Sequence, residues 1–150
     1  MFDARELWRN ILEVLRPIAL EKSIRVTERI PDAPLMVFGD KQELREVFTN
    51  LVFNSVKFTD RGGEIIVELA GKAGEATMMI SDTGVGIPAE VLDQSFSATP
   101  QAEASPSSIR DSLRVGLLVV QDIIRLHGGQ ISVSSRNGGG VTFLITLPVF

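Results

Sequence analysis

Asn50, Asn54 and Lys57 have the spacing of residues that share one face of a helix, and their chemistry suits a metal-bound phosphate. They lie at positions i, i+4 and i+7 of one segment, whose apolar residues point elsewhere. A carboxamide oxygen is a hard ligand for Mg²⁺, which takes its other ligands from water and phosphate oxygens. Lys57 adds a positive charge within reach of the same phosphates. For any one of these residues alone, the alternative is a solvated polar helix face.

A second group of candidate residues follows a predicted strand that ends at Asp82. A carboxylate at a strand end can accept a hydrogen bond from an exocyclic amine such as that of adenine. Gly84 and Gly86 come next, and glycine permits positive φ and the close approach of a ligand to the backbone. The alternative for Asp82 is an Asx turn that caps the loop. Together with the polar helix face, this turn favours a nucleotide site.

Composition limits the class of protein. A chain of 150 residues is one domain in size, and 44% hydrophobic with 6% aromatic residues suits an aliphatic core. The absence of cysteine excludes disulfides and thiolate metal sites, and the net charge of −4 argues against nucleic acid as a partner. The single histidine, His127, lies at a predicted helix end, where we predict a structural role. No apolar run is long enough to span a bilayer, so we expect no direct membrane contact in this segment. The lack of cysteine is compatible with a cytoplasmic setting, and a membrane anchor of the parent protein would lie outside these residues.

Periodicity predicts alternating helices and strand pairs. The predicted helices run from a capping Asp3 to Ile18, from Asp40 to about Thr59, and from Ser112 to Leu126, with a short helix starting at Pro88. The predicted strands are Ile24–Ile30, Leu35–Phe38, Glu64–Ala70, Ala76–Asp82, Gln130–Ser135 and Val141–Pro148. Residues 95–111 are predicted to form a mobile surface loop. This order predicts an α+β fold, a two-layer sandwich in which helices cover one face of a mixed sheet.

The motifs resemble those of a known family. Asn50–Thr59 resembles the N box, and Asp82–Pro88 the first glycine box, of the catalytic ATP-binding domain of sensor histidine kinases, a group within the Bergerat-fold (GHKL) ATPases and kinases. Leu126–Gly129 and Gly138–Phe143 match the end of that domain, so the resemblance covers nearly the whole chain. It implies a single domain over residues 1–150, a mostly antiparallel sheet, and a lid over ATP formed by about 95–111.

The resemblance also implies roles for individual residues. Asn54 would bind Mg²⁺, Lys57 would contact phosphate, and Asp82 would bind the adenine amino group, with Gly84 and Gly86 in the same box. Thr142, on a neighbouring strand, would support the adenine contact through its hydroxyl or through a water.

Two further residues of the N box follow from the same resemblance. Phe58 would present an apolar surface near the nucleotide. Asn50 stands where hydrolytic members carry a glutamate that activates water. Because a carboxamide cannot accept that proton, the resemblance implies phosphoryl transfer rather than hydrolysis.

The second glycine box departs from the family pattern. Where the family shows Gly-x-Gly-Leu-Gly-Leu, this chain has Ser112 and Arg114 in place of two glycines and keeps Gly116. Backbone N–H groups at such a helix start cradle phosphates, so these changes are predicted to weaken ATP binding. Ser112 still offers a hydroxyl, and Arg114 either adds a charge or blocks the approach. Arg110, in the lid, would steady the γ-phosphate.

The resulting functional prediction is a histidine kinase catalytic domain that uses Mg²⁺ and ATP. It would transfer the γ-phosphoryl group to a histidine on a separate domain, for relay to a response regulator. The family's phosphoacceptor hairpin, which also mediates dimerisation, is not among these residues, so we expect a monomer. The alternatives are a non-catalytic interaction module with weak or no ATP binding, and an ATP-hydrolysing clamp of the same fold.

Overall fold

The computed structural model describes residues 1–84, 109–136 and 139–149, and for 109–116, 135 and 136 it describes the backbone only. The helices are α1 (Ala4–Glu21), α2 (Lys41–Phe58) and α4 (Ile109–Leu126). The strands are β1 (Phe2–Asp3), β2 (Arg25–Arg29), β3 (Met36–Val37), β4 (Glu64–Lys72), β5 (Glu75–Asp82), β6 (Gln130–Arg136) and β7 (Gly140–Pro148).

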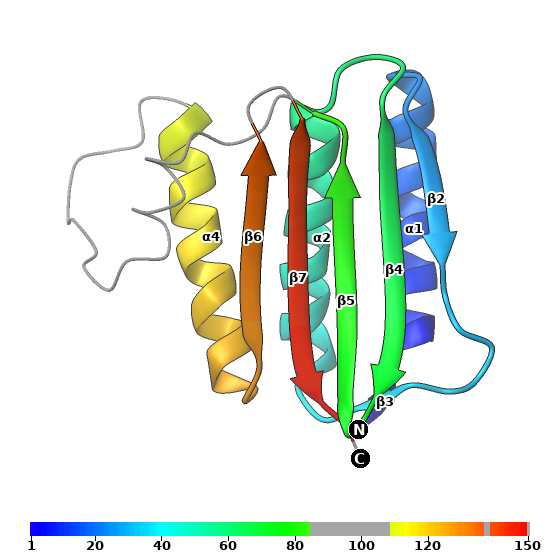
Figure 1. Cartoon of the computed structure of the whole chain (residues 1–150), viewed down its shortest axis with the longest axis vertical. Coiled ribbons are helices and arrows are strands. Elements are labelled where there is room, and N and C mark those ends of the chain that lie inside the picture. The colour runs from blue at the N-terminus through cyan, green and yellow to red at the C-terminus, as the bar shows by residue number, and fades with distance from the viewer. Residues whose placement is uncertain (85–108, 137–138, 150) are drawn as a thin grey trace.

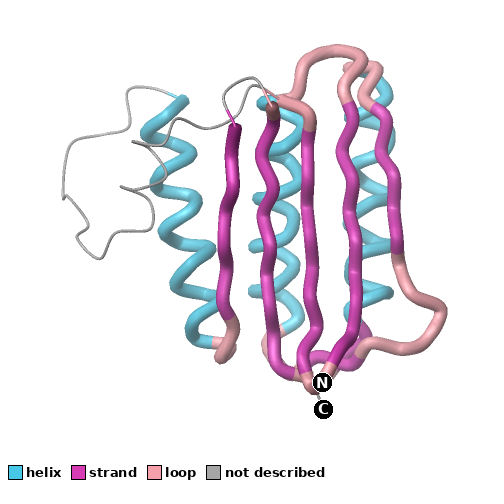
Figure 2. Tube along the Cα trace, viewed as in Figure 1, coloured by secondary structure: helices cyan, strands magenta, loops and turns pink. Residues whose placement is uncertain are grey.

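Five of these strands form one sheet in the order β2-β4-β5-β7-β6. The β2–β4 pair is parallel, and the other three pairs are antiparallel. The labelled helices lie together behind this sheet in Figure 1, and Figure 2 shows the same two layers. The predicted α+β sandwich, with helices on one face of a mixed and mostly antiparallel sheet, is therefore confirmed.

Strand alternation decides which side chains meet the helices. On β5, Met78 and Ile80 are buried, whereas Ser81 points to the other face and is half-buried. On the helical side, Trp8 of α1 stacks on Phe48 of α2 with ring centroids 4.9 Å apart. The aliphatic core therefore lies between the sheet and the helices, and it fixes α2 against β5.

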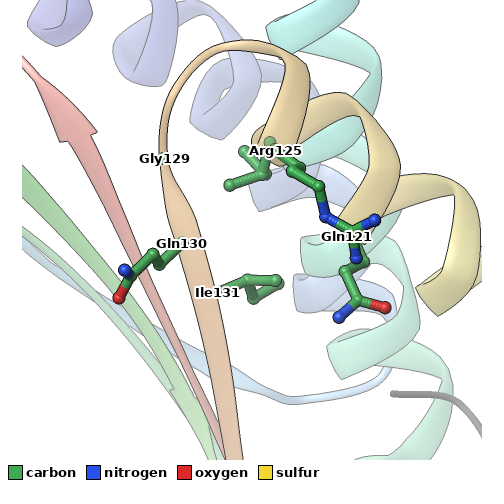
Figure 3. A pocket seen from close by; sticks show the side chains of 6 residues that line it. Gln121, Arg125, Gly129, Gln130 and Ile131 are labelled. Atoms are coloured by element: carbon green, nitrogen blue, oxygen red, sulfur yellow. The ribbon is translucent and has the colours of Figure 1, made fainter. Parts of the chain in front are cut away.

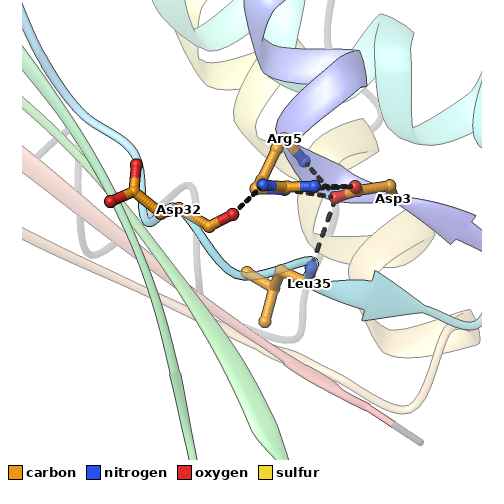
Figure 4. Close-up of polar contacts among 4 residues, drawn as sticks. All are labelled: Asp3, Arg5, Asp32 and Leu35. Atoms are coloured by element: carbon orange, nitrogen blue, oxygen red, sulfur yellow. Dashed lines mark hydrogen bonds and ion pairs between the residues drawn. The ribbon is translucent and has the colours of Figure 1, made fainter.

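The N-terminus is tied down by a polar cluster (Figure 4). Asp3 caps α1, because its Oδ1 accepts hydrogen bonds from the backbone N–H groups of Arg5 at 3.0 Å and Leu35 at 3.3 Å. The Arg5 guanidinium bonds both Asp3 carboxylate oxygens and also donates to the Asp32 carbonyl. The hydrogen bonds from the Arg5 side chain hold the pKa of Asp3 below its ordinary value. The cluster thus joins the start of α1 to the segment between β2 and β3.

His127 ties the end of α4 to the start of α2. Its Nε2 accepts a hydrogen bond from the Asp40 backbone N–H at 3.1 Å. The proton therefore lies on Nδ1, which donates to the Ile123 carbonyl at 2.8 Å. Both ring nitrogens are used in packing two helices, which is the structural role predicted for this residue.

Several boundaries differ from the prediction. The two-residue strand β1, which pairs antiparallel with β3, was not predicted. β3 itself is shorter than Leu35–Phe38, and α4 begins at Ile109, earlier than the predicted Ser112. The predicted helix at Pro88 and most of the loop 95–111 lie outside the described residues.

Candidate functional site

Helix α2 carries the polar face that the sequence predicted. Asp40 starts the helix by accepting hydrogen bonds from the N–H groups of Gln42 at 2.9 Å and Glu43 at 3.2 Å. On the half-buried face further along, Asn54 Nδ2 donates to Asn50 Oδ1 at 3.3 Å. This bond uses the Asn54 amine and leaves its carbonyl oxygen, which is the atom that would bind a metal, without a hydrogen bond among the described residues.

The last turn of α2 holds a cation and an aromatic ring. Lys57 is exposed, and its Nζ lies 5.9 Å from the centre of the Phe58 ring. Phe58 is half-buried and packs against the core. Lys57 therefore has its charge in solvent at the helix end, where it also complements the helix dipole.

Asp82 ends β5 as a buried carboxylate, 6% exposed. Its Oδ1 accepts hydrogen bonds from the N–H groups of Gly84 at 2.8 Å and Val141 at 3.3 Å. Burial raises the pKa of Asp82 above its ordinary value, and these two hydrogen bonds oppose that effect only in part. The Gly84 bond makes the Asx turn that was the alternative interpretation, so the capping turn and an acid buried beside the polar helix occur together.

Gly84 and Gly140 allow the backbone around this turn to pack closely against α2 and β7. A Cβ atom on Gly84 would lie 2.3 Å from the Phe58 carbonyl oxygen, so the turn rests directly on the last turn of α2. A Cβ atom on Gly140 would lie 1.9 Å from the Asp82 carbonyl oxygen, and Gly140 has a φ of +90°. The end of β5 is therefore held between α2 and the start of β7, which places Asp82 at the same end of the sheet as Lys57.

Sequence reasoning missed the part that Gly140 plays at this site. The available signal was the glycine run 138–140, which we assigned to the closing motif without a contact. Gly84 was expected to serve through positive φ or the approach of a ligand. In the structure its φ is not positive, and the group that approaches it is the chain's own backbone.

Thr142 lies on the other face of the sheet from Asp82. It pairs with Ser81 across β5 and β7, and the two hydroxyls are 3.0 Å apart. Because successive side chains of a strand point to opposite faces, Ser81 and Thr142 point away from the helices while Asp82 points toward them. The structure does not bring the Thr142 hydroxyl to Asp82; Val141, through its N–H, is the β7 residue that contacts the acid.

The remaining predicted residues cannot be placed beside this turn. Gly86 lies outside the described residues. Arg110, Ser112, Arg114 and Gly116 belong to α4, whose backbone is helical there, but their side chains are outside the described part of the chain. In Figure 1 the start of α4 is at the same end of the molecule as the end of β5.

Pockets whose lining belongs to described residues lie beside the helices. The first, of about 390 Å³, lies where α4 ends and β6 begins (Figure 3). It is lined by Gln121, Ile124, Arg125, Gly129, Gln130 and Ile131. Asp82 lies at the opposite end of the sheet (Figure 1), so this pocket is not part of the candidate site.

The second pocket, of about 550 Å³, follows α2. Its described lining residues are Lys41, Gln42, Arg45 and Glu46. Glu46 lies one turn before Asn50, so the pocket lies along the polar face that Asn50 and Asn54 continue. Its described lining belongs to the first two turns of α2, at the opposite end of the helix from Lys57 and the Asp82 turn, so this pocket is not by itself the candidate nucleotide site.

The donor set fits a magnesium nucleotide better than a metal held by protein alone. Within residues 1–84, 109–136 and 139–149, no three His, Cys, Asp or Glu side chains gather as a metal cluster. A metal at Asn54 would then take most of its ligands from phosphates and water, which is how Mg²⁺ is commonly held. In the same ranges, no helix is long and apolar enough to cross a membrane.

Comparisons with known proteins identify the family. Residues 39–150 match the model of the histidine kinase-, DNA gyrase B-, and HSP90-like ATPase family. The histidine protein kinase DivJ of Caulobacter vibrioides is 34% identical over 149 residues, which cover 99% of this chain and 25% of DivJ. The adaptive-response sensory kinase SasA of Thermosynechococcus vestitus is 35% identical over 150 residues, covering 99% of this chain and 39% of SasA.

Solved structures show the same fold. The nucleotide-free catalytic domain of the histidine kinase ThkA superposes with a TM-score of 0.82 at 24% identity, covering 98% of this chain and 95% of that domain. The chain spans about a quarter of the length of DivJ. It is therefore a member of the histidine kinase-, DNA gyrase B-, and HSP90-like ATPase family, and it corresponds to the ATP-binding domain found in sensor histidine kinases.

Proposed function

We propose that this domain binds Mg·ATP and presents the γ-phosphoryl group to a histidine on a separate domain of a sensor histidine kinase. The observation that carries the proposal is the contact between the Asp82–Gly84 turn and the last turn of α2. That contact joins a purine-reading acid and a phosphate-binding helix face into one unit. Family membership supports ATP as the nucleotide.

Each side chain has a defined task in this proposal. Asp82 accepts a hydrogen bond from the adenine 6-amino group, and its two backbone hydrogen bonds fix its direction. The Asn54 carbonyl oxygen would bind Mg²⁺, which when bound neutralises phosphate charge. Lys57 would contact the same phosphates, and Phe58 would present an apolar edge to the nucleotide. Catalysis then consists of positioning and charge stabilisation.

Asn50 makes the domain a transferase rather than a hydrolase in this account. A general base must take a proton from the attacking water, and a carboxamide has no basic site for it. Asn50 instead accepts the hydrogen bond that orients Asn54. Transfer of the γ-phosphoryl group to a histidine would therefore be favoured over its transfer to water.

The phosphates would reach the start of α4. Gly86, Ser112, Arg114 and Gly116 are proposed phosphate contacts, with Arg110 beside the γ-phosphate. We propose that Ser112 and Arg114 weaken binding, because side chains there displace the close backbone approach that glycine permits. The partner domains would be a phosphoacceptor helix pair and a response regulator, as in the solved complex of ThkA with its response regulator TrrA.

Isothermal titration calorimetry with Mg·ATP tests this proposal. We expect saturable binding by the wild type, binding about 100-fold weaker in Asp82→Asn, and a smaller weakening in Asn54→Ala. Asp122→Asn and Asn10→Ala are matched controls, since both residues are exposed and belong to other parts of the fold. If the wild type shows no heat at millimolar nucleotide, the domain is an interaction module instead. Phosphate release without an acceptor would indicate a hydrolysing clamp.

A further inference from the structure

Ser55 is a buried hydroxyl without a hydrogen-bond partner in the described part of the chain. It follows Asn54 on α2, and the residue is 2% exposed. Buried polar groups nearly always have a partner, so this exception requires an explanation. Thr59, one turn later, gives the contrast, because its buried hydroxyl donates to the Ser55 carbonyl at 2.6 Å.

The Asp82 carboxylate lies close enough to this hydroxyl to be affected by it. Both backbone hydrogen bonds to Asp82 end on Oδ1, so Oδ2 receives neither of them. The Ser55 hydroxyl is close enough to lower the pKa of Asp82, although the two groups do not form a hydrogen bond of ordinary geometry. Among the described residues, no charged side chain contributes to the pKa of this acid. A buried carboxylate therefore lies near a hydroxyl that donates no hydrogen bond in the described part of the chain.

We propose that Ser55 is a positioning residue for purine recognition, whose hydroxyl donates to the Asp82 carboxylate, directly or through one water, when a nucleotide occupies the site. This inference rests on the proposed function. The bond would hold Asp82 in its ionised form and aim Oδ2 at the ligand. An ionised carboxylate accepts from the 6-amino group of adenine and repels the 6-oxo group of guanine. Ser55 would therefore contribute to the choice of adenine over guanine.

Ser55→Ala tests the role, with Thr59→Val as the matched control on the same helix. We expect Ser55→Ala to bind Mg·ATP about tenfold more weakly and Mg·GTP within about twofold of wild type. Its melting temperature without nucleotide should fall less than that of Thr59→Val, since the deleted hydroxyl makes no hydrogen bond and only assists the ionised form of Asp82. Thr59→Val should lower the melting temperature, because a formed hydrogen bond is lost, and should leave ATP affinity unchanged.

A second measurement separates positioning from packing. The carboxyl carbon of Asp82 can be titrated by NMR in the nucleotide-free protein. Without the Ser55 hydroxyl, one of the groups that oppose the burial effect is gone, so the titration midpoint should rise in Ser55→Ala and stay unchanged in Thr59→Val. The loss of ATP affinity on mild acidification should begin at a correspondingly higher pH.

The outcomes distinguish this inference from the proposed function. If the wild type binds Mg·ATP and Ser55→Ala matches it in both affinity and titration midpoint, the inference is wrong and the proposed function stands. If the wild type fails to bind, the proposed function fails and this role for Ser55 fails with it. Equal weakening toward ATP and GTP would also overturn the inference, because it would indicate a general packing defect.

Discussion

Asp3 is half-buried and Asp82 is buried, and their surroundings shift the pKa values of the two acids in opposite directions. Each accepts two backbone hydrogen bonds, and they lie at opposite ends of the sheet (Figure 1). Asp3 has the Arg5 guanidinium as a partner, which lowers its pKa. No cation of the described part of the chain pairs with Asp82, and burial raises its pKa.

The surroundings of Asp3 suit a role in stability, and those of Asp82 suit a role in ligand binding. At the end of the molecule with Asp3 and His127, the Asp3 carboxylate and both His127 ring nitrogens are hydrogen-bonded by other groups of the chain, although Trp8 Nε1 on α1 is buried without a partner among the described residues. At the end with Asp82, the Ser55 hydroxyl is unmatched and the Lys57 charge faces solvent. Among the described residues, Asp82 has neither a cation partner nor a backbone hydrogen bond to Oδ2, so it can accept a hydrogen bond from a ligand. On this basis we assign Asp82 to binding and Asp3 to stability.

The largest effect is expected from moving Asp82 itself. Gly140→Ala would place a methyl group 1.9 Å from the Asp82 carbonyl oxygen, so we expect a loss of about 4 kcal/mol in the free energy of unfolding. Gly74→Ala is the control: its φ of +83° matches, but no atom lies within 4 Å of the added Cβ, so the cost should be about 1 kcal/mol. Urea unfolding measures both, and equal costs would show that backbone strain, rather than contact with Asp82, decides.

The next largest effects are expected from Asp82→Asn and Asp3→Asn, which should change ATP affinity and stability in opposite ways. Asp82→Asn keeps an oxygen for the two backbone hydrogen bonds but removes the buried charge, so the melting temperature should hold or rise. ATP affinity should fall about 100-fold, because the amide is a poorer acceptor for the adenine amine. Asp3→Asn should do the reverse, with a loss of about 1 to 2 kcal/mol in stability and unchanged ATP affinity. If the same variant lost more of both stability and ATP affinity, the two acids would not have the separate roles assigned to them.

The pH dependence of stability should differ in sign at the two acids. The folded pKa of Asp3 is lowered, so its stabilisation is complete above the unfolded pKa and is lost as the pH falls through the folded value. The folded pKa of Asp82 is raised, so its burial is unfavourable at neutral pH and is relieved by protonation on acidification. Acid unfolding of Asp3→Asn and Asp82→Asn against wild type should therefore give difference curves of opposite slope below about pH 5.

The smallest effect is expected at the start of α4. Replacing Ser112 and Arg114 together by glycine should tighten Mg·ATP binding about fivefold, if the missing backbone approach limits affinity. Competition with a fluorescent ATP analogue would measure the change. Unchanged or weaker binding would show that these two side chains already contribute contacts, and would end the proposal that this box is impaired.

Local signals in the sequence were sufficient for the elements that position the site. Helix α2 begins after Asp40 and ends before Thr59, as predicted, and β5 ends at Asp82. Capping preference and strand alternation operate over a few residues, so they can be read without knowledge of the fold. For the same reason, the shared face of Asn50 and Asn54 followed from spacing alone.

Long-range contacts were not accessible in that way. Thr142 was assigned from a motif. One residue of register reverses the face of a strand, so only its pairing with Ser81 shows that Thr142 and Asp82 lie on opposite faces of the sheet. Gly140 matters because of the Asp82 carbonyl, which is distant in sequence. Strand β1 is two residues long and exists through its pairing with β3, so it leaves no periodic signal.

A crystal structure of the domain with Mg²⁺ and a non-hydrolysable ATP analogue would test the central claim most directly. We predict the adenine 6-amino group within hydrogen-bond distance of Asp82, and the metal on Asn54 in the same cavity. A nucleotide bound elsewhere, or one that contacts Asn54 while Asp82 remains covered by the chain's own backbone, would contradict the account.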